Sequence, residues 1–262
     1  MLPILFSIGP LHLYSLSFFL VLAWCVFSLV FWKALRREAV EEERIFDLMF
    51  WGTLVSAIVA RVGFIVLHPE LFARSILKMF ALWVVPGLAF YPGLVAGVLT
   101  MVVLAKRKGL RAALVADALA FALPGALSIG AIGALLGGSV VGVTTKLPWA
   151  VGVVGYPGLR HPIGGYEAIL LLLVLLVIGV LEIRAKRRDW PLGLLGIWFF
   201  LIISGGNFLL EFLVEHQLYW GLSANQWMLI IILGQAVGAF YVRGGGREGV
   251  KKIYGRIRRG TS

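Results

Sequence analysis

This sequence has little cysteine and little charge. Its 262 residues include one cysteine, Cys25, and only 14% are Asp, Glu, Lys or Arg. One cysteine excludes an intramolecular disulfide and a metal site built from several thiolates. Soluble domains carry about 25% charged residues, whereas this chain is 60% hydrophobic with a mean hydropathy of +0.95. A soluble fold cannot bury that much apolar surface, so we expect a polytopic membrane protein.

Familiar catalytic spacings are missing as well. The sequence holds no Ser/His/Asp arrangement at a recognisable spacing, no phosphate-binding loop and no zinc-ligand spacing, so no metal or cofactor is expected. No internal repeat is visible, which disfavours a transporter built from inverted repeats. Residues 1–10 contain no basic stretch, and no small-residue cleavage site follows the first apolar run. We therefore expect no cleavable signal peptide.

Long apolar stretches are abundant, and about 20 such residues suffice for a helix to cross a bilayer. We expect an all-α polytopic bundle of seven transmembrane helices. No linker is long enough to divide the chain, so residues 1–262 are predicted to form a single membrane domain. The predicted spans are residues 11–32, 46–67, 80–105, 112–142, 166–183, 191–213 and 226–242, followed by a basic cytoplasmic tail at 243–262.

The basic residues are unevenly distributed among the loops. Of the 24 lysines and arginines, 19 lie in the tail or in the connections after the first, third and fifth predicted spans. By the positive-inside rule these segments face the cytoplasm, so the N-terminus lies outside and the C-terminus is cytoplasmic. The net charge of +11 therefore indicates topology and attraction to anionic lipid, not nucleic-acid binding. A multi-pass protein of the bacterial inner membrane is expected.

Polar side chains inside predicted spans are functional candidates, because an ionisable group in the bilayer is costly. Arg61 must pair with a carboxylate such as Glu211 or Glu167, bind a lipid phosphate through parallel N–H bonds, or extend to the interface. Glu211 and Asn207 are one helical turn apart on the sixth span. They could line a polar site or form a structural hydrogen bond between helices.

Three residues near the span ends are further candidates. His161 follows Arg160 in an expected outer loop and is the best-placed acid–base group, because histidine titrates near neutral pH. A lone loop histidine can equally be a bystander. Tyr14 opens the first span as either a proton acceptor or an aromatic anchor at the interface. Asp117 lies near the start of its helix, where a carboxylate complements the helix dipole, so a capping role is expected.

The order of motifs resembles that of the bacterial prolipoprotein diacylglyceryl transferases. FSIGPLHLYSL (residues 6–16) is similar to the opening of that family, and Arg61-Val-Gly63 resembles its GGRIGY segment. FYPGLVAG (residues 90–97) resembles FHGGLIG, and RHPIGGYE (residues 160–167) resembles RHPSQLYE. The resemblance covers nearly the whole chain in order. It implies the same seven spans and the same orientation.

Membership of that family implies a transfer reaction at the outer leaflet. The thiol of a lipobox cysteine in a prolipoprotein attacks the glycerol carbon of phosphatidylglycerol and displaces glycerol-1-phosphate. Such chemistry needs a base, because a free thiol with a pKa of about 8.5 is mostly protonated at neutral pH. It also needs a cationic clamp for the departing phosphate. In the family, two arginines and a histidine are assigned to this work.

This sequence departs from the family pattern at those positions. The replacements are Tyr91 for the histidine of FHGG, Ala131, Ala134 and Ser139 for the arginine, asparagine and glutamate of the signature box, and Asn207 for the arginine of RxxxE. Whether the chain is an enzyme is therefore open. The alternative is a non-catalytic relative that serves as a lipid-binding or partner-binding membrane subunit.

The sequence offers eight candidate site residues. His161 and Tyr14 are candidates for proton transfer; Arg61, Arg160, Glu211, Asn207, Tyr91 and Gly138 are candidates for binding a phosphatidylglycerol-like phospholipid. The box itself lies in residues 124–142, PGALSIGAIGALLGGSVVG, which keep six glycines and contain no ionisable group. Small residues at this density let a helix or a lipid approach the backbone closely. We expect a packing seam that admits an acyl chain.

Overall fold

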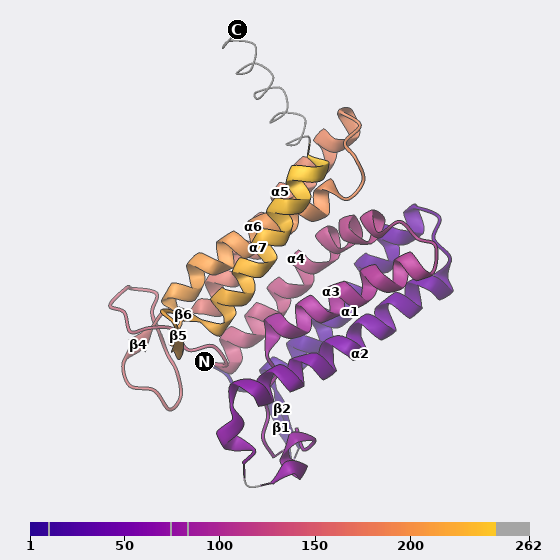
Figure 1. Cartoon of the computed structure of the whole chain (residues 1–262). Coiled ribbons are helices and arrows are strands. Elements are labelled where there is room, and N and C mark those ends of the chain that lie inside the picture. Colours follow the sequence, from indigo (N-terminus) through magenta and orange to yellow (C-terminus); the bar gives the residue numbers. More distant parts are fainter. Residues whose placement is uncertain (10, 74, 83, 245–262) are drawn as a thin grey trace. The chain divides into compact units, whose positions relative to one another are not determined.

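Seven helices in the described part of the chain are long and apolar enough to cross a membrane, as predicted. The computed structural model describes residues 1–9, 11–73, 75–82 and 84–244 (Figure 1). The helices are α1 Ser15–Arg37, α2 Glu42–Leu67, α3 Phe90–Arg107, α4 Ala112–Gly137, α5 Ile163–Arg187, α6 Leu194–Leu210 and α7 Ala224–Arg243. A short 3-10 turn, Glu211–Leu213, continues α6. Of the predicted tail at 243–262, all but the first two residues lie outside the described part.

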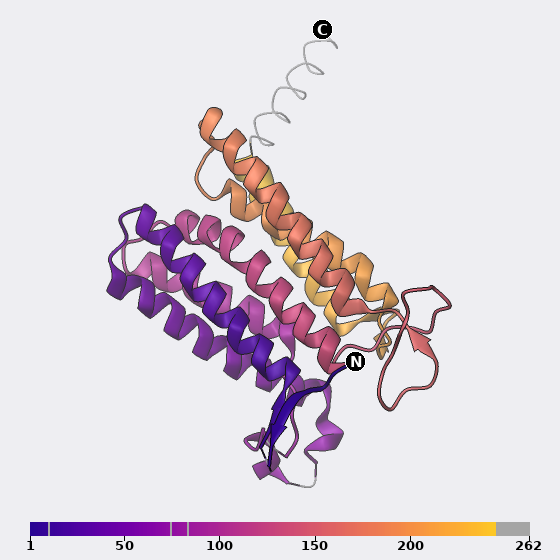
Figure 2. The same cartoon turned by 180° about the vertical axis from the view of Figure 1, so that it is seen from behind.

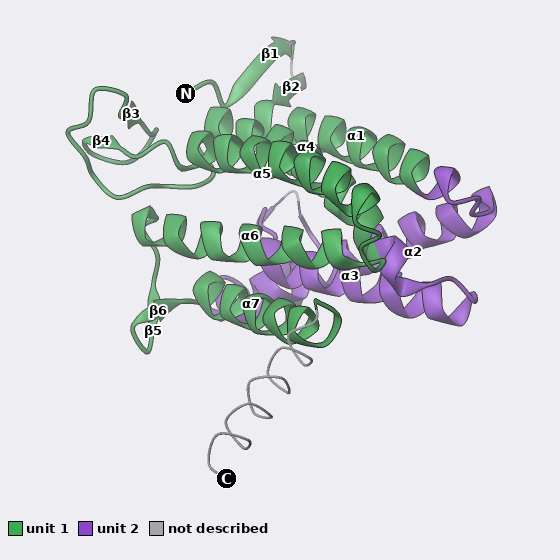
Figure 3. Ribbon diagram, turned by 90° about the horizontal axis from the view of Figure 1, so that it is seen from above, with its two compact units in different colours: residues 1–34, 116–262 green, residues 35–115 purple. Residues whose placement is uncertain are grey.

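The chain forms two compact units, coloured separately in Figure 3. Unit 1 consists of Met1–Ala34 and Ala116–Ser262, and unit 2 consists of Leu35–Val115. Unit 2 contains α2 and α3, while unit 1 contains α5, α6, α7 and most of α1 and α4. The single membrane domain and the orientation of the termini stay predictions.

Small residues line the contact between α2 and α3 in unit 2. A Cβ added to Gly93 of α3 would lie 2.8 Å from the Cβ of Ala60, and one added to Gly97 would lie 3.1 Å from the Cβ of Ser56. Ala60 and Ser56 both belong to α2. In a membrane the hydrophobic effect does not drive helices together, so close van der Waals packing of this kind stabilises the helix pair.

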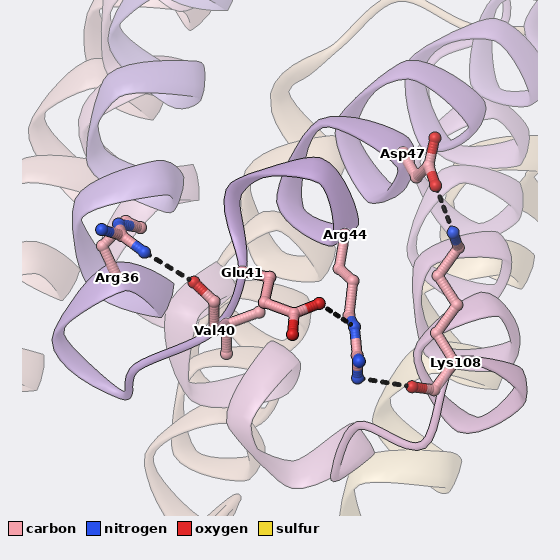
Figure 4. Close-up of polar contacts among 6 residues, drawn as sticks. All are labelled: Arg36, Val40, Glu41, Arg44, Asp47 and Lys108. Atoms are coloured by element: carbon pink, nitrogen blue, oxygen red, sulfur yellow. Dashed lines mark hydrogen bonds and ion pairs between the residues drawn. The ribbon is translucent and has the colours of Figure 1, made fainter.

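Polar contacts fix the opposite, basic end of the same helix pair (Figure 4). The Nε of Arg44 lies 2.8 Å from the Oε2 of Glu41, and its Nη1 donates to the carbonyl of Lys108 at 3.0 Å. The Lys108 ammonium forms an ion pair with Asp47 of α2. These groups are partly exposed, so each pair contributes about 0–1 kcal/mol. They align the start of α2 with the end of α3.

The third span begins later than predicted. The described residues 80–82 and 84–89 are not helical, and α3 starts at Phe90. Pro86 lacks a backbone N–H and disfavours the helical conformation in the residue before it, which prevents an earlier start. Pro92 is tolerated because it falls in the first turn of α3, where backbone N–H groups have no intrahelical partner. Hydropathy alone does not separate such an apolar connector from a helix.

The first span also begins later than predicted, because a hairpin precedes it in unit 1. Strand β1 (Ile4–Ile8) pairs antiparallel with β2 (Leu11–Tyr14) directly before α1, as Figure 2 shows in indigo. The turn contains Gly9 at a φ of +58°, a conformation that glycine adopts without strain. Ser15 then anchors the hairpin, since its backbone N–H donates to the Pro3 carbonyl at 2.9 Å.

The glycine-rich helix α4 packs closely against its neighbours in unit 1. A Cβ on Gly137 would lie 3.3 Å from the Cβ of Leu16 in α1. Gly164 at the start of α5 makes an even closer approach, since its Cβ would lie 2.8 Å from the backbone nitrogen of Leu135. The helical part of residues 124–142 is therefore a packing seam at these positions.

Helix α4 ends at Gly137, before the predicted limit at 142. Gly138 has a φ of +65°, the left-handed conformation that terminates many helices. Gly142 lies beyond the helix, and a Cβ there would lie 2.9 Å from the Cβ of His161 and collide with the His161 carbonyl. The last residues of the stretch therefore support a loop that carries a candidate site residue.

Asp117 caps a helix, although not its own. Its carboxylate accepts backbone N–H bonds from Gly193 at 2.7 Å and Gly196 at 2.9 Å, at the start of α6. The first N–H groups of a helix have no intrahelical partner, and Gly193, the N-cap residue, has no side chain to supply one. Asp117 thereby joins α4 to α6 within unit 1.

Candidate functional site

Polar residues gather at the end of unit 1 where α4 ends and α5 begins. An antiparallel bridge joins Gly142 to Val214, and another joins Thr144 to Arg160. Two short hairpins complete this end, β3 (Val151–Gly152) with β4 (Leu159–Arg160), and β5 (Leu218–Tyr219) with β6 (Leu222–Ser223). We use the term polar layer for the side chains of Trp149, Arg160, His161, Tyr166, Glu211, Glu215, His216, Ser223 and Asn225.

Arg160 is the buried cation of the polar layer and is only 4% exposed. Its Nη1 donates to the Gly142 carbonyl at 2.9 Å and forms an ion pair with Glu215. The guanidinium carbon lies 5.0 Å from the ring centroid of Tyr156, a cation–π arrangement. The buried Nε has no hydrogen-bond partner among the described residues. A buried donor left unpaired costs about 1–3 kcal/mol, so this N–H can gain from an acceptor that binds here.

His161 contacts Tyr166, which is itself bonded to Trp149. Its Nδ1 lies 3.2 Å from the hydroxyl oxygen of Tyr166, which also accepts a hydrogen bond from the indole N–H of Trp149 at 2.7 Å. The contact fits either imidazole tautomer, because a phenol can donate or accept. When Nδ1 carries the proton and donates to Tyr166, Nε2 is left with a lone pair that can take up a proton.

Glu211 is a buried carboxylate with three polar partners, and its side chain is 8% exposed. His216 Nε2 lies 2.7 Å from Oε2, the amide of Asn225 donates to Oε1 at 2.7 Å, and the Ser223 hydroxyl lies 3.4 Å from Oε2. Ser223 also forms a capping box with Gln226 at the start of α7. The carboxylate therefore ties the end of α6 to the β5–β6 hairpin and to α7.

Comparison with known proteins identifies the family. The family model described as prolipoprotein diacylglyceryl transferase matches residues 3–242. The chain belongs to this family. A phosphatidylglycerol–prolipoprotein diacylglyceryl transferase from Pseudoalteromonas atlantica is 32% identical over 93% of this chain and 86% of its own. One from Vibrio vulnificus is 30% identical over 93% and 88%, and one from Geobacter sulfurreducens is 29% identical over 85% and 86%.

The resemblance seen in the sequence is thus confirmed, and the protein is a diacylglyceryl transferase-like, multi-pass membrane protein. Two of the positions that depart from the family pattern lie in the interior of unit 1. Ala131 of α4 is 6% exposed and Asn207 of α6 is 7% exposed. The Asn207 amide donates to the carbonyl of Ile203 in its own helix at 3.0 Å. The carbonyl of Ala131 packs against Gly164.

Glu211 and Asn207 bond to different partners among the described residues, and their predicted role in lining a polar site stays a prediction. Asn207 bonds to its own helix, whereas Glu211 bonds to residues from the segment after α6 and from the start of α7. In the family pattern an arginine precedes the glutamate by one turn. Here His216, five residues after Glu211, contacts the carboxylate instead.

Arg61 and Tyr91 belong to unit 2 and lie on α2 and α3. Arg61 is 9% exposed, and four of its N–H groups donate to backbone carbonyls: Nε to Met79, Nη1 to Val85 and Gly87, and Nη2 to Lys78, at 2.9 to 3.0 Å. A guanidinium has five N–H donors. Its predicted phosphate-binding role stays a prediction, with one N–H left for such a ligand.

The remaining predicted site residues differ in their surroundings. Tyr14 lies on β2 opposite Ile4 and is 53% exposed, while Tyr91 is 6% exposed. Gly138 follows α4 and lies near Met1, whose sulfur would be 3.0 Å from an added Cβ. The roles predicted for these three residues stay predictions. The structure brings together Arg160, His161 and Glu211 in the polar layer.

Reasoning from the sequence missed several members of that layer. Trp149, Glu215, His216 and Asn225 each lie outside the predicted spans, where polar residues are ordinary. A usable signal was the departure of Asn207 from the family's arginine. A buried glutamate needs a polar partner, and the histidine nearest in sequence supplies one here.

Proposed function

We propose that this chain transfers a diacylglyceryl group from phosphatidylglycerol to the lipobox cysteine of a prolipoprotein at the outer leaflet of the bacterial inner membrane. The names of the relatives support the two substrates. The distribution of lysine and arginine supports an outer N-terminus and a cytoplasmic C-terminus. The polar layer is formed by the α4–α5 connection, the α6–α7 connection and the helix ends beside them. In that orientation it faces the outer side.

At the glycerol carbon the reaction forms one bond and breaks one. The cysteine sulfur bonds to the glycerol carbon, the bond from that carbon to the phosphate oxygen breaks, and glycerol-1-phosphate leaves. The thiol proton passes to a base. His161 fits this role because Tyr166, which also accepts from Trp149, contacts Nδ1, which leaves Nε2 as the acceptor in one tautomer.

Arg160 fits the role of phosphate-binding group. The observation that carries the proposal is its buried Nε, which is unpaired in the described structure and lies on the residue next to His161. A phosphate oxygen at this N–H would form a charge-assisted hydrogen bond, and such bonds contribute about 1.5–3 kcal/mol. The proposed base and the proposed clamp thus lie on adjacent residues at one end of unit 1.

A second candidate function is non-catalytic phospholipid binding. It is favoured by the burial of Ala131 and Asn207, which stand where the family pattern has arginines. A donor that stabilises a developing negative charge is commonly worth about 3–4 kcal/mol of the barrier. Without both arginines, the polar layer has to supply that stabilisation through Arg160, or the chain binds lipid without turning it over.

Complementation of a transferase-depleted bacterial strain tests the proposal. We expect the wild-type chain to restore diacylglyceryl-modified lipoprotein, measured by mass spectrometry, and Arg160→Ala to abolish it. Lys146→Ala is the matched control, because Lys146 is a basic, exposed residue of the same connection. Wild-type protein that inserts correctly but restores no modified lipoprotein would overturn the transferase proposal. Retained binding of phosphatidylglycerol vesicles by that protein would then support the non-catalytic function.

A further inference from the structure

The segment between α2 and α3 exposes large apolar side chains although it is not a membrane-spanning helix. This connector, residues 68–89, contains the short 3-10 helices η1 (Pro69–Leu71) and η2 (Ile76–Met79). In and just after η2, Ile76 is 73% exposed, Leu77 80% and Phe80 77%. Exposed apolar residues in such a group mark a surface that contacts a partner or a membrane.

Arg61 fixes the inner side of the connector. Its N–H groups bond to carbonyls at both ends of the segment from Lys78 to Gly87, so one side chain closes a ten-residue loop. The backbone N–H of Ala89 also donates to the carbonyl of Ala60, which directly precedes Arg61, at 2.8 Å. Arg61 therefore fixes both ends of this loop, at Lys78 and Met79 and at Val85 and Gly87.

Two aromatic rings support the same guanidinium. The Arg61 carbon Cζ lies 5.3 Å from the ring centroid of Phe72 and 5.8 Å from that of Phe64. Phe72 itself is 2% exposed and belongs to the connector. The ring of Phe64 lies where a Cβ on Gly87 would have to be, so a side chain at 87 would displace it. Charge, ring contacts and close packing thus hold one face of the connector inward and leave Leu77 and Phe80 outward.

Exposed apolar residues also occur where the connector joins the helices on either side. Val66, near the end of α2, is 70% exposed, and Phe90, the first residue of α3, is 50% exposed. Both helices are long and apolar enough to cross a membrane. The connector carries Glu70, Arg74 and Lys78 and hence no net negative charge that anionic lipid would repel.

We propose that the connector inserts its exposed apolar residues into the lipid interface, and that Arg61 is the positioning residue that holds it in the inserting shape. The exposed apolar residues of the connector contact the bilayer surface, whereas the spanning helices are surrounded by the deeper hydrocarbon. This proposal does not depend on the transferase chemistry, because it rests on contacts within unit 2.

Depth-dependent fluorescence quenching tests the insertion. A bimane label is attached to Leu77→Cys or Phe80→Cys in a Cys25→Ser background, and the protein is placed in phosphatidylglycerol-containing nanodiscs with spin-labelled lipids. Glu38→Cys, an exposed position between α1 and α2, is the control. We expect shallow spin labels to quench both connector positions at least twofold more than Glu38→Cys. Equal quenching at all three positions would overturn the insertion. It would also be overturned if the connector labels were quenched only by an added water-soluble protein partner and not by spin-labelled lipid.

Hydrogen exchange tests the role of Arg61 in the same nanodiscs. Arg61→Lys keeps the charge, but one ammonium cannot reach four carbonyls that a planar guanidinium spans. We expect amide exchange in residues 78–89 to rise at least tenfold, with exchange in α6 and α7 unchanged. Arg44→Lys, on the same helix with one carbonyl partner, should leave the connector unchanged. Unchanged exchange in Arg61→Lys would refute the positioning role, and the labelling result stands even if this variant does not fold.

Discussion

Replacement of His216 with alanine removes an imidazole that bonds the buried carboxylate of Glu211. Nε2 and Oε2 are 2.7 Å apart, and the two side chains are 31% and 8% exposed. Complete loss of one partner of a buried ion pair costs about 3–5 kcal/mol. Since His216 is about one-third exposed, water replaces part of the lost contact. We therefore expect a loss close to that of one hydrogen bond to a charged group, about 2 kcal/mol in the free energy of unfolding.

The assay is reversible unfolding in mixed micelles, carried out as a double-mutant cycle with Glu211→Gln. Because the two groups touch, the double variant should lose about 1–2 kcal/mol less than the sum of the single variants. The matched control is the pair Glu182 and Lys186, whose charged atoms are also 2.7 Å apart but in which the lysine side chain is 74% exposed. Lys186→Ala should cost less than about 0.5 kcal/mol. A loss of that size for His216→Ala, or strict additivity in the cycle, would refute the reasoning.

Two further substitutions test the contacts that support the site. Asp117→Ala removes the acceptor of two N–H groups at the start of α6 and should lower the free energy of unfolding by about 1–2 kcal/mol, the value of a lost helix cap; an unchanged unfolding curve would contradict this. Gly142→Ala places a Cβ against the carbonyl of His161 and should cost about 1–3 kcal/mol, with faster amide exchange around His161. A variant as stable as wild type, with unchanged exchange, would show that the loop accommodates the methyl group.

The sequence was sufficient to predict the seven spans because about 20 apolar residues in a row have few alternatives to a membrane helix. It was less informative about where helices begin. The apolar character of residues 80–89 is that of a span, yet Pro86 and the contacts of Arg61 make this segment a connector. Those contacts are to backbone carbonyls, and no residue pattern indicates which carbonyls a folded loop will offer.

The candidate site was only partly predictable from the sequence. Arg160 and His161 are adjacent in sequence and their motif resembles that of a family, so both were predicted as candidates. His216 was not found, because its importance comes from the burial of Glu211 beside it, and burial of a group just beyond a span depends on the tertiary fold. The helix cap at Asp117 joins residues 76 positions apart, and only the packing of α4 against α6 brings them together.

The most direct test of the transferase proposal uses the purified chain, phosphatidylglycerol vesicles and a synthetic lipobox peptide with one cysteine. The proposal predicts a peptide that carries one diacylglyceryl group in thioether linkage, detected by mass spectrometry, together with release of glycerol-1-phosphate. Both products should be lost in His161→Ala, while vesicle binding is kept. An unmodified peptide in the presence of folded, lipid-binding wild-type protein would contradict the proposal.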